Sequence, residues 1–291
     1  MSNPTSYFSA PSTELDPKLF NGRSLRSWVR SGITGMLNDF MGRKYRQAEA
    51  WARPYLAGSG VSYQWQAARE PKDLDCLVGI NFVQFRKANP DYAGLSDKEI
   101  SAQFNEEFDE GLRQENWNGY ELTFFALINE DIKTIKPYAA YDVKDDEWVV
   151  TPNPSQTAPS SLEWDSVVDN DRKAASAVEN KFNAAMQDIR YSRNDAIRRN
   201  AENNLTMAAA QGNALYNEIH GNRSMAFSET GEGYGDFHNY RWQAGKRSGT
   251  VQSLRNIREY MKASLQSKNP YGVELPDAST LIRRAAIYRN Q

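Results

Sequence analysis

Two apolar runs decide the fold of this 291-residue chain: Tyr55-Leu56-Ala57, closed by Gly58-Ser59-Gly60, and Asp73-Leu74-Asp75-Cys76-Leu77-Val78-Gly79-Ile80. Short apolar runs bounded by glycine or polar residues are typical of strands. Residues two apart in a strand point to the same side, so Asp73 and Asp75 share one face and Leu74 and Cys76 the other. A third run, Tyr120-Glu121-Leu122-Thr123-Phe124-Phe125-Ala126-Leu127-Ile128, has the strongest strand composition in the chain.

Helical patterns surround these strand candidates. Apolar residues recur at spacings of three and four from about 23 to 52, which predicts a helix that Pro54 ends. A mainly helical insertion is expected from about 82 to 115. The acidic run of 145–147 is expected to form a solvated turn with Asp142, before a short strand at Trp148-Val149-Val150.

The segment 151–159 holds three prolines and no charge, which is the composition of an extended linker. We therefore expect four parts: a loosely held polar lead-in (1–22), a first domain (23–151), a linker (152–159) and a helical domain (160–291). Ser160 and Glu163 form a possible capping box at the start of a long helix. Further helices are expected near 250–267 and 277–288, and 221–249 is expected to be a Gly-rich loop.

Composition excludes several classes of protein. Apolar residues make up 40% and charged residues 25%, as in an ordinary globular protein. No run is long enough for a membrane helix, and the N-terminus lacks the pattern of a signal peptide. One cysteine cannot form an intrachain disulfide, and two histidines do not suffice for a structural zinc. We expect a cytoplasmic protein whose metal ligands, where a metal is used, are carboxylates that suit magnesium or manganese.

Charge is unevenly distributed along the chain. Acidic residues are in excess over 1–150 and basic residues are modestly in excess over 151–291. The segment 221–249 contains a mixture of aromatic and basic residues that suits a ligand with a base and a phosphate, and Arg241, Lys246 and Arg247 are the candidate contacts. The competing interpretation is a connector whose aromatic residues anchor a core.

The acidic pair has a chemical explanation. Adjacent carboxylates repel each other unless a divalent cation lies between them, so Asp73 and Asp75 indicate a metal site that Glu121 on a neighbouring strand would complete. Gly58 in a tight turn would let backbone N–H groups approach a phosphate, and the hydroxyl of Ser59 can donate a hydrogen bond to it.

The order Gly-Ser, a gap of thirteen residues, Asp-x-Asp and a later acidic residue resembles the DNA-polymerase-beta-like nucleotidyltransferase superfamily over about 50–130. This resemblance implies an α+β fold with a small mixed sheet flanked by helices, and two Mg²⁺ (or Mn²⁺) ions. It implies transfer of a nucleoside monophosphate from a nucleoside triphosphate to a hydroxyl, with release of pyrophosphate. Gly58 and Ser59 match the triphosphate turn, Asp73 and Asp75 the metal pair, and Glu121 the third carboxylate. Glu121 departs from the family's frequent Asp, and the insertion before it is long.

Two other functions stay open. Asp73-Leu74-Asp75 could be the metal-binding motif of a sugar-nucleotide glycosyltransferase, although that leaves Gly58 and Ser59 without a role. The chain could also be a catalytically idle nucleotidyltransferase-like scaffold that binds a nucleotide or a partner. The acceptor is equally open among RNA, a nucleotide, a small molecule and a protein; the basic second half favours RNA or a nucleotide.

Overall fold

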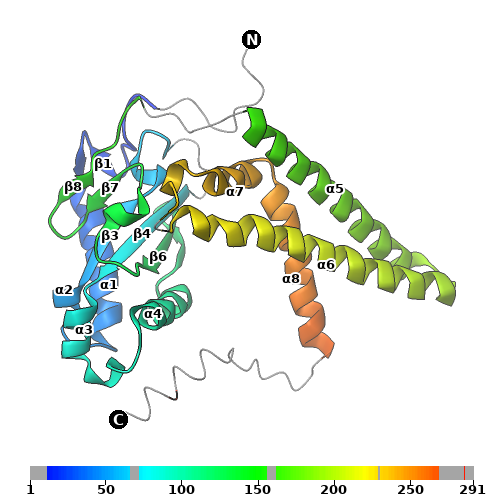
Figure 1. Ribbon diagram of the computed structural model, residues 1–291, viewed down its shortest axis with the longest axis horizontal. Helices are drawn as coiled ribbons and strands as arrows, with labels where there is room; N and C mark the ends of the chain where they lie inside the picture. Colours follow the sequence, from blue (N-terminus) through cyan, green and yellow to red (C-terminus); the bar gives the residue numbers. More distant parts are fainter. Residues whose placement is uncertain (1–11, 66–71, 156–161, 229, 269–284, 286–291) are drawn as a thin grey trace. The chain divides into compact units, whose positions relative to one another are not determined.

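The computed structural model describes residues 12–65, 72–155, 162–228, 230–268 and 285 (Figure 1). The described residues form two compact units, one within 12–155 and the other within 162–268. The fold is α+β: the first unit contains the β-sheets and the second is helical. In the described part of the chain, no helix has both the length and the apolar character needed to cross a bilayer.

The first unit is built on a six-stranded mixed sheet with the order β5-β6-β4-β3-β7-β8. Only the β4–β6 pair in this sheet is parallel; the other neighbours are antiparallel. A separate hairpin joins β1 (Phe20–Asn21) to β2 (Ser24–Leu25). The six strands are β3 (Ala52–Ala57), β4 (Lys72–Ile80), β5 (Gln114–Trp117), β6 (Tyr120–Ala126), β7 (Ala140–Asp142) and β8 (Glu147–Val150).

One face of this sheet carries the main core. Leu74, Cys76 and Leu122 are fully buried there, in a core that they share with apolar side chains of four helices. Figure 1 shows these helices beside the sheet. A dense aromatic cluster forms between the helices, in which Trp51 stacks on Phe104 with ring centroids 5.7 Å apart. The helices are α1 (Ser27–Gly42), α2 (Ala48–Trp51), α3 (Phe82–Ala88) and α4 (Asp97–Gly111).

Local chemistry explains these boundaries and corrects two expectations. The predicted helix over 23–52 is two helices, because the chain turns after Gly42 and Gln47 adopts a left-handed conformation (φ 54°). Pro54 lies inside β3 rather than at the end of a helix. Its carbonyl accepts a hydrogen bond from the Val143 N–H, just past the end of β7. Proline has no N–H to return to the Val143 carbonyl, which accepts from Nε of Arg30 at 2.9 Å instead.

The lead-in is partly a packed element. Residues 1–11 lie outside the described residues, but Leu15, Leu19 and Phe20 are at most 4% exposed and belong to the main core. The expectation of a loosely held segment over 12–22 was therefore wrong. The polar composition of this segment conceals the three apolar anchors.

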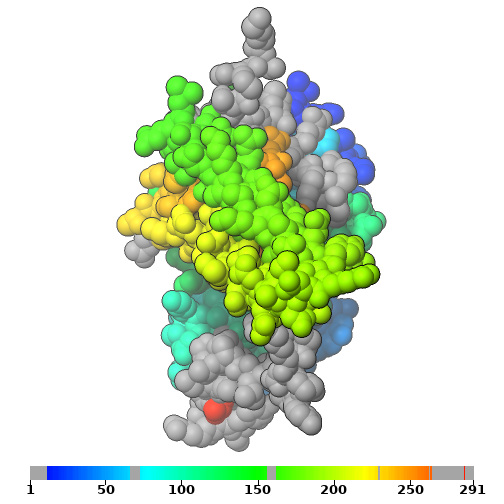
Figure 2. All heavy atoms as spheres, turned by 90° about the vertical axis from the view of Figure 1, so that its right-hand side faces the viewer, coloured from blue at the N-terminus to red at the C-terminus, as the bar shows by residue number. Residues whose placement is uncertain are grey.

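The second unit is an antiparallel helical hairpin closed by two further helices. It consists of α5 (Leu162–Tyr191), α6 (Asp195–Ala226), α7 (Phe237–Arg247) and α8 (Thr250–Lys268). Figure 2 shows α5 and α6 side by side, and small buried residues such as Ala175, Ala208 and Gly212 line the packed faces. The predicted capping box at Ser160 and the helix over 277–288 are not within the described residues, apart from residue 285.

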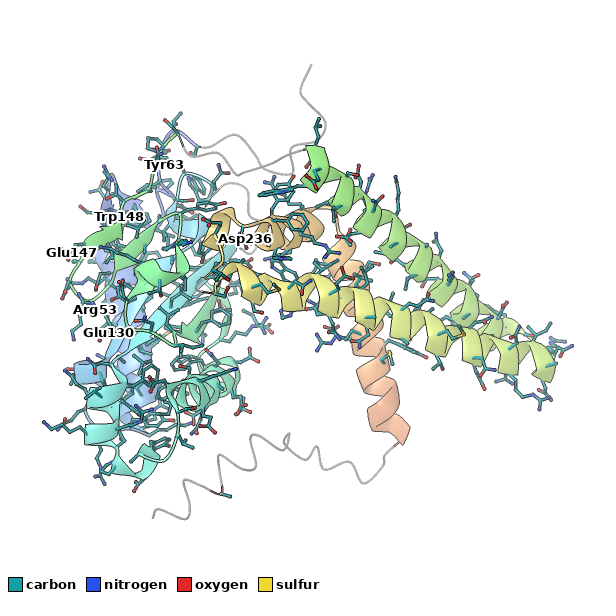
Figure 3. All side chains as sticks on the ribbon, viewed as in Figure 1. Arg53, Tyr63, Glu130, Glu147, Trp148 and Asp236 are labelled. Carbon is teal, nitrogen blue, oxygen red and sulfur yellow. The ribbon has the colours of Figure 1, made fainter. Side chains whose placement is uncertain are left out.

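The expected loop over 221–249 is mainly helical. α6 continues to Ala226, and α7 begins after Asp236, whose carboxylate accepts a hydrogen bond from the His238 N–H at 2.8 Å (Figure 3). Tyr240 and Trp242 of α7 are buried core residues. The glycines around α7 conceal its helical periodicity in the sequence.

Candidate active site

An acidic face lies on the side of the sheet opposite the main core. Asp73 and Asp75 of β4 are half-buried and alternate with the fully buried Leu74 and Cys76. Burial and the neighbouring Asp75 raise the pKa of the Cys76 thiol, which keeps that thiol protonated. The strand therefore presents carboxylates on one side and an inert apolar surface on the other.

Register places the third carboxylate beside the pair. β4 and β6 run parallel, with Asp73 opposite Glu121 and Asp75 opposite Thr123. Residues opposite each other on neighbouring strands share a face, so all four side chains lie on the acidic face. The Thr123 hydroxyl donates a hydrogen bond to an Asp75 carboxylate oxygen at 3.1 Å.

The glycine turn borders the same face. Ala57, the last residue of β3, pairs with Asp75, so Gly58 and Ser59 follow directly beside the carboxylates. Gly58 has φ 86° and ψ −159°, a conformation open essentially only to glycine. A Cβ on Gly60 would lie 3.1 Å from the Asp73 carbonyl oxygen, which shows how closely the turn packs on β4. Ser59 begins a short 3-10 helix that ends at Val61.

An arginine that sequence reasoning missed holds Glu121. Nη2 of Arg113 donates a hydrogen bond to Oε1 of Glu121 at 2.6 Å, and Nη1 lies 3.5 Å from Asp109. The bond to Glu121 raises the pKa of the Arg113 guanidinium. Within 12–65, 72–155, 162–228 and 230–268, no group of three or more His, Cys, Asp or Glu side chains could hold a metal ion. Asp73 and Asp75 supply the hard oxygen donors that magnesium prefers, whereas Glu121 is engaged by Arg113.

The acidic stretch after β6 is not simply a solvated turn. Asp142 is fully buried and forms an ion pair with Arg53, which also contacts Asp145. The backbone N–H groups of Lys144 and Asp145 donate to the same Asp142 oxygen at 2.8 and 2.9 Å. Arg53 lies on β3 (Figure 3), and its partners fix the turn between β7 and β8. The expectation of a solvated Asp142 was wrong, because the sequence does not show which strand supplies the arginine.

Arg241 of the helical unit is a core residue. Its guanidinium donates two hydrogen bonds to Asp171, at 2.6 and 2.7 Å, and a third to Glu218 at 2.9 Å. These contacts raise its pKa, and the residue is only 7% exposed. Arg241 is therefore engaged within the unit rather than presented to a nucleotide. Lys246 and Arg247 lie in the last turn of α7, where burial lowers the pKa of Arg247.

Comparison of the chain with protein-family models, with curated proteins and with solved structures finds no match. Function is therefore inferred from the geometry of the acidic face and of the glycine turn.

Proposed function

We propose that this chain is a metal-dependent nucleotidyltransferase that moves a nucleoside monophosphate from a nucleoside triphosphate to a hydroxyl acceptor and releases pyrophosphate. One observation carries the proposal: Asp73, Asp75 and Glu121 share a face across the β4–β6 pair, and Gly58-Ser59 borders it beside Asp75. The strands come from three separate parts of the sequence. Their joint arrangement supports a phosphate site next to carboxylates.

In this proposal each group has a defined task. Asp73 and Asp75 would hold magnesium or manganese, and the ion would neutralise charge on the triphosphate. The Gly58 turn and the Ser59 hydroxyl bind the phosphates. The acceptor oxygen forms a bond to the α-phosphorus, and the bond from that phosphorus to the bridging oxygen breaks. Pyrophosphate leaves with the electron pair, and the hydroxyl proton passes to solvent or to a carboxylate.

Glu121 joins the other two carboxylates only when Arg113 releases it. The 2.6 Å ion pair joins an Arg113 side chain that is 45% exposed to a Glu121 side chain that is 19% exposed. A divalent cation bound by Glu121 would have to displace this guanidinium. Arg113 is then available for the negatively charged triphosphate or acceptor.

A nucleotide-binding scaffold without transfer activity is the second candidate. The observation that favours it is the same Arg113–Glu121 pair, since it occupies the third carboxylate that the proposed metal site would use. The two candidates share the phosphate turn, so binding of a triphosphate does not distinguish them. Release of pyrophosphate does.

The deciding experiment incubates the protein with each labelled nucleoside triphosphate and Mg²⁺ or Mn²⁺, with and without total RNA, and measures label transfer, pyrophosphate release and triphosphate binding. Binding of sugar nucleotides is measured in parallel. An Asp73→Asn/Asp75→Asn double variant is the negative sample. The matched control is Glu147→Gln, which removes an exposed carboxylate on β8 (Figure 3). Label transfer that the double variant loses and the control keeps supports the transferase. Triphosphate binding without pyrophosphate release favours the scaffold, and binding of sugar nucleotides alone favours the glycosyltransferase.

A further inference from the structure

A cluster of cations and aromatic rings lies on the helical unit, separate from Arg241. Tyr216, His220 and Arg223 follow one another at spacings of four and three on α6, so they share one face of that helix. Arg255 and Arg258 are three apart on α8, and Trp242 comes from α7. We call this set the α6–α8 cluster: Tyr216, His220, Arg223, Trp242, Arg255 and Arg258.

Aromatic rings hold the guanidinium groups in place. The Arg258 guanidinium lies 4.9 Å from the centroid of the Tyr216 ring, and that of Arg223 lies 5.8 Å from the Trp242 ring. His220 stacks on Tyr216 at 5.4 Å. Tyr216 and Trp242 are 6% and 5% exposed, so their faces are covered and cannot stack on a nucleobase. The rings therefore position cations, and the cluster is suited to phosphate rather than to base recognition.

The arginines of the cluster form no ion pairs within the described part of the chain. Among the described residues, neither Arg223 nor Arg255 nor Arg258 forms an ion pair with a carboxylate, whereas the nearby Glu218 is engaged by Arg241. The Nε atom of Arg223 is buried and has no hydrogen-bond partner in the structure. A buried donor without a partner is costly, and an oxyanion would satisfy it once the Arg223 side chain shifts to expose Nε.

The electrostatics of His220 agree with this arrangement. Burial lowers the pKa of its imidazole, and Arg223 on α6 with Arg258 and Arg255 on α8 lower it further. α7 contributes the uncharged Trp242 to this environment. Three cations thus act on one neutral ring, and an anion placed among them would relieve their mutual repulsion.

We propose that the α6–α8 cluster binds the phosphate groups of a nucleotide or of a nucleic-acid strand. A phosphate carries negative oxygens that accept several hydrogen bonds at once, which matches the donor geometry of arginine. Assignment of this ligand as the acceptor of nucleotidyl transfer rests on the proposed function. The binding itself does not.

The test measures binding without catalysis. The Asp73→Asn/Asp75→Asn variant, kept in a metal chelator, is titrated with inorganic phosphate, with a mononucleotide and with a short single-stranded RNA carrying a fluorescent label. Arg223→Gln and Arg258→Gln are each expected to weaken binding about tenfold or more, as expected for loss of a charged hydrogen bond. For the RNA, each arginine variant should also reduce the magnitude of the slope of the logarithm of the binding constant against the logarithm of the salt concentration by about 0.7. Arg198→Gln, an exposed cation at the other end of α6, is the matched control.

The outcomes separate the two ligand sources. Tight binding of the RNA with weak binding of the mononucleotide identifies a strand, and similar binding of both identifies a nucleotide. The proposal is overturned when the Asp73→Asn/Asp75→Asn protein binds these ligands equally well with and without the Arg223→Gln or Arg258→Gln substitution.

NMR titration of His220 in the unsubstituted chain provides a readout that needs no arginine variant: a bound phosphate should raise the pKa of His220. An unchanged His220 pKa at saturating ligand also overturns the proposal. His238→Gln assigns the signals, since the chain has two histidines.

Discussion

Replacement of Arg241 by methionine should lower the free energy of unfolding of the helical unit far more than replacement of an exposed residue does. The substitution removes a guanidinium that makes two hydrogen bonds to Asp171 and one to Glu218. Asp171 is 8% exposed, so its carboxylate would be left buried without a cation. Glu218 is exposed and can be hydrated instead. The cost therefore comes mainly from Asp171.

The size of this effect follows from the burial of the pair. Removal of one partner of a buried ion pair costs about 3–5 kcal/mol. The helical unit spans roughly a hundred residues, for which 1 kcal/mol shifts the melting temperature by about 4–8 °C. Arg241→Met is thus expected to lower Tm by more than about 10 °C. The expected cost of about 3–5 kcal/mol is a large part of the roughly 5–15 kcal/mol that stabilises a typical domain.

Urea unfolding followed by far-UV circular dichroism measures this cost. Arg172→Met is the matched control, because Arg172 on α5 forms an exposed ion pair with Asp169 and its loss should cost under about 1 kcal/mol. An Arg241→Met/Asp171→Leu double variant should regain most of the stability, since an apolar pair of suitable volume replaces a buried ion pair well. Arg241→Met with a free energy of unfolding within about 1 kcal/mol of the unsubstituted chain would refute the reasoning.

Three further predictions concern the sites. Gly58→Ala should cost about 1–3 kcal/mol and impair triphosphate binding, because φ 86° with ψ −159° is strained for alanine; thermal denaturation and nucleotide titration should distinguish it from Gly42→Ala, where the added methyl meets no atom within 4 Å. Arg113→Gln should release Glu121, so Mn²⁺ should raise the melting temperature more than in the unsubstituted chain, and equal shifts would count against a three-carboxylate site. Because its pKa is lowered on folding, His220 stays neutral at pH values where the unfolded chain binds a proton, so stability falls as pH drops below about 6.5. His220→Gln should flatten the decline in urea stability between pH values of about 7 and 5; an identical decline in both proteins would contradict the assignment.

Local patterns were enough to predict the elements that carry the acidic face. Alternation along β4 places Asp73 and Asp75 opposite Leu74 and Cys76, and this depends only on the two-residue period of a strand. The composition of β6 likewise identifies it as a strand. Both inferences need no knowledge of distant partners, so the sequence suffices for them.

The ion pairs were not predictable in the same way. Arg113 and Glu121 meet because β5 and β6 form a hairpin whose register shifts between Gln114 and Trp117. Arg241 and Asp171 lie seventy residues apart and come together only when α5 and α7 pack. In the sequence, Arg241 therefore resembled a ligand contact, because it lies in a segment rich in aromatic residues. Its partner in the structure is the core carboxylate of Asp171.

The parallel alignment of β4 and β6 has a consequence for how the protein folds. A parallel pair cannot close through a tight turn, so the chain must pass through α3 and α4 between Ile80 and Tyr120 before the strands meet. Contacts between residues so far apart form late, because loop-closure entropy opposes them, whereas helices form from local contacts. A refolding chain would thus regain most of its helix before Asp73 faces Glu121. We therefore expect the acidic face to assemble late, since it depends on the pairing of β4 with β6.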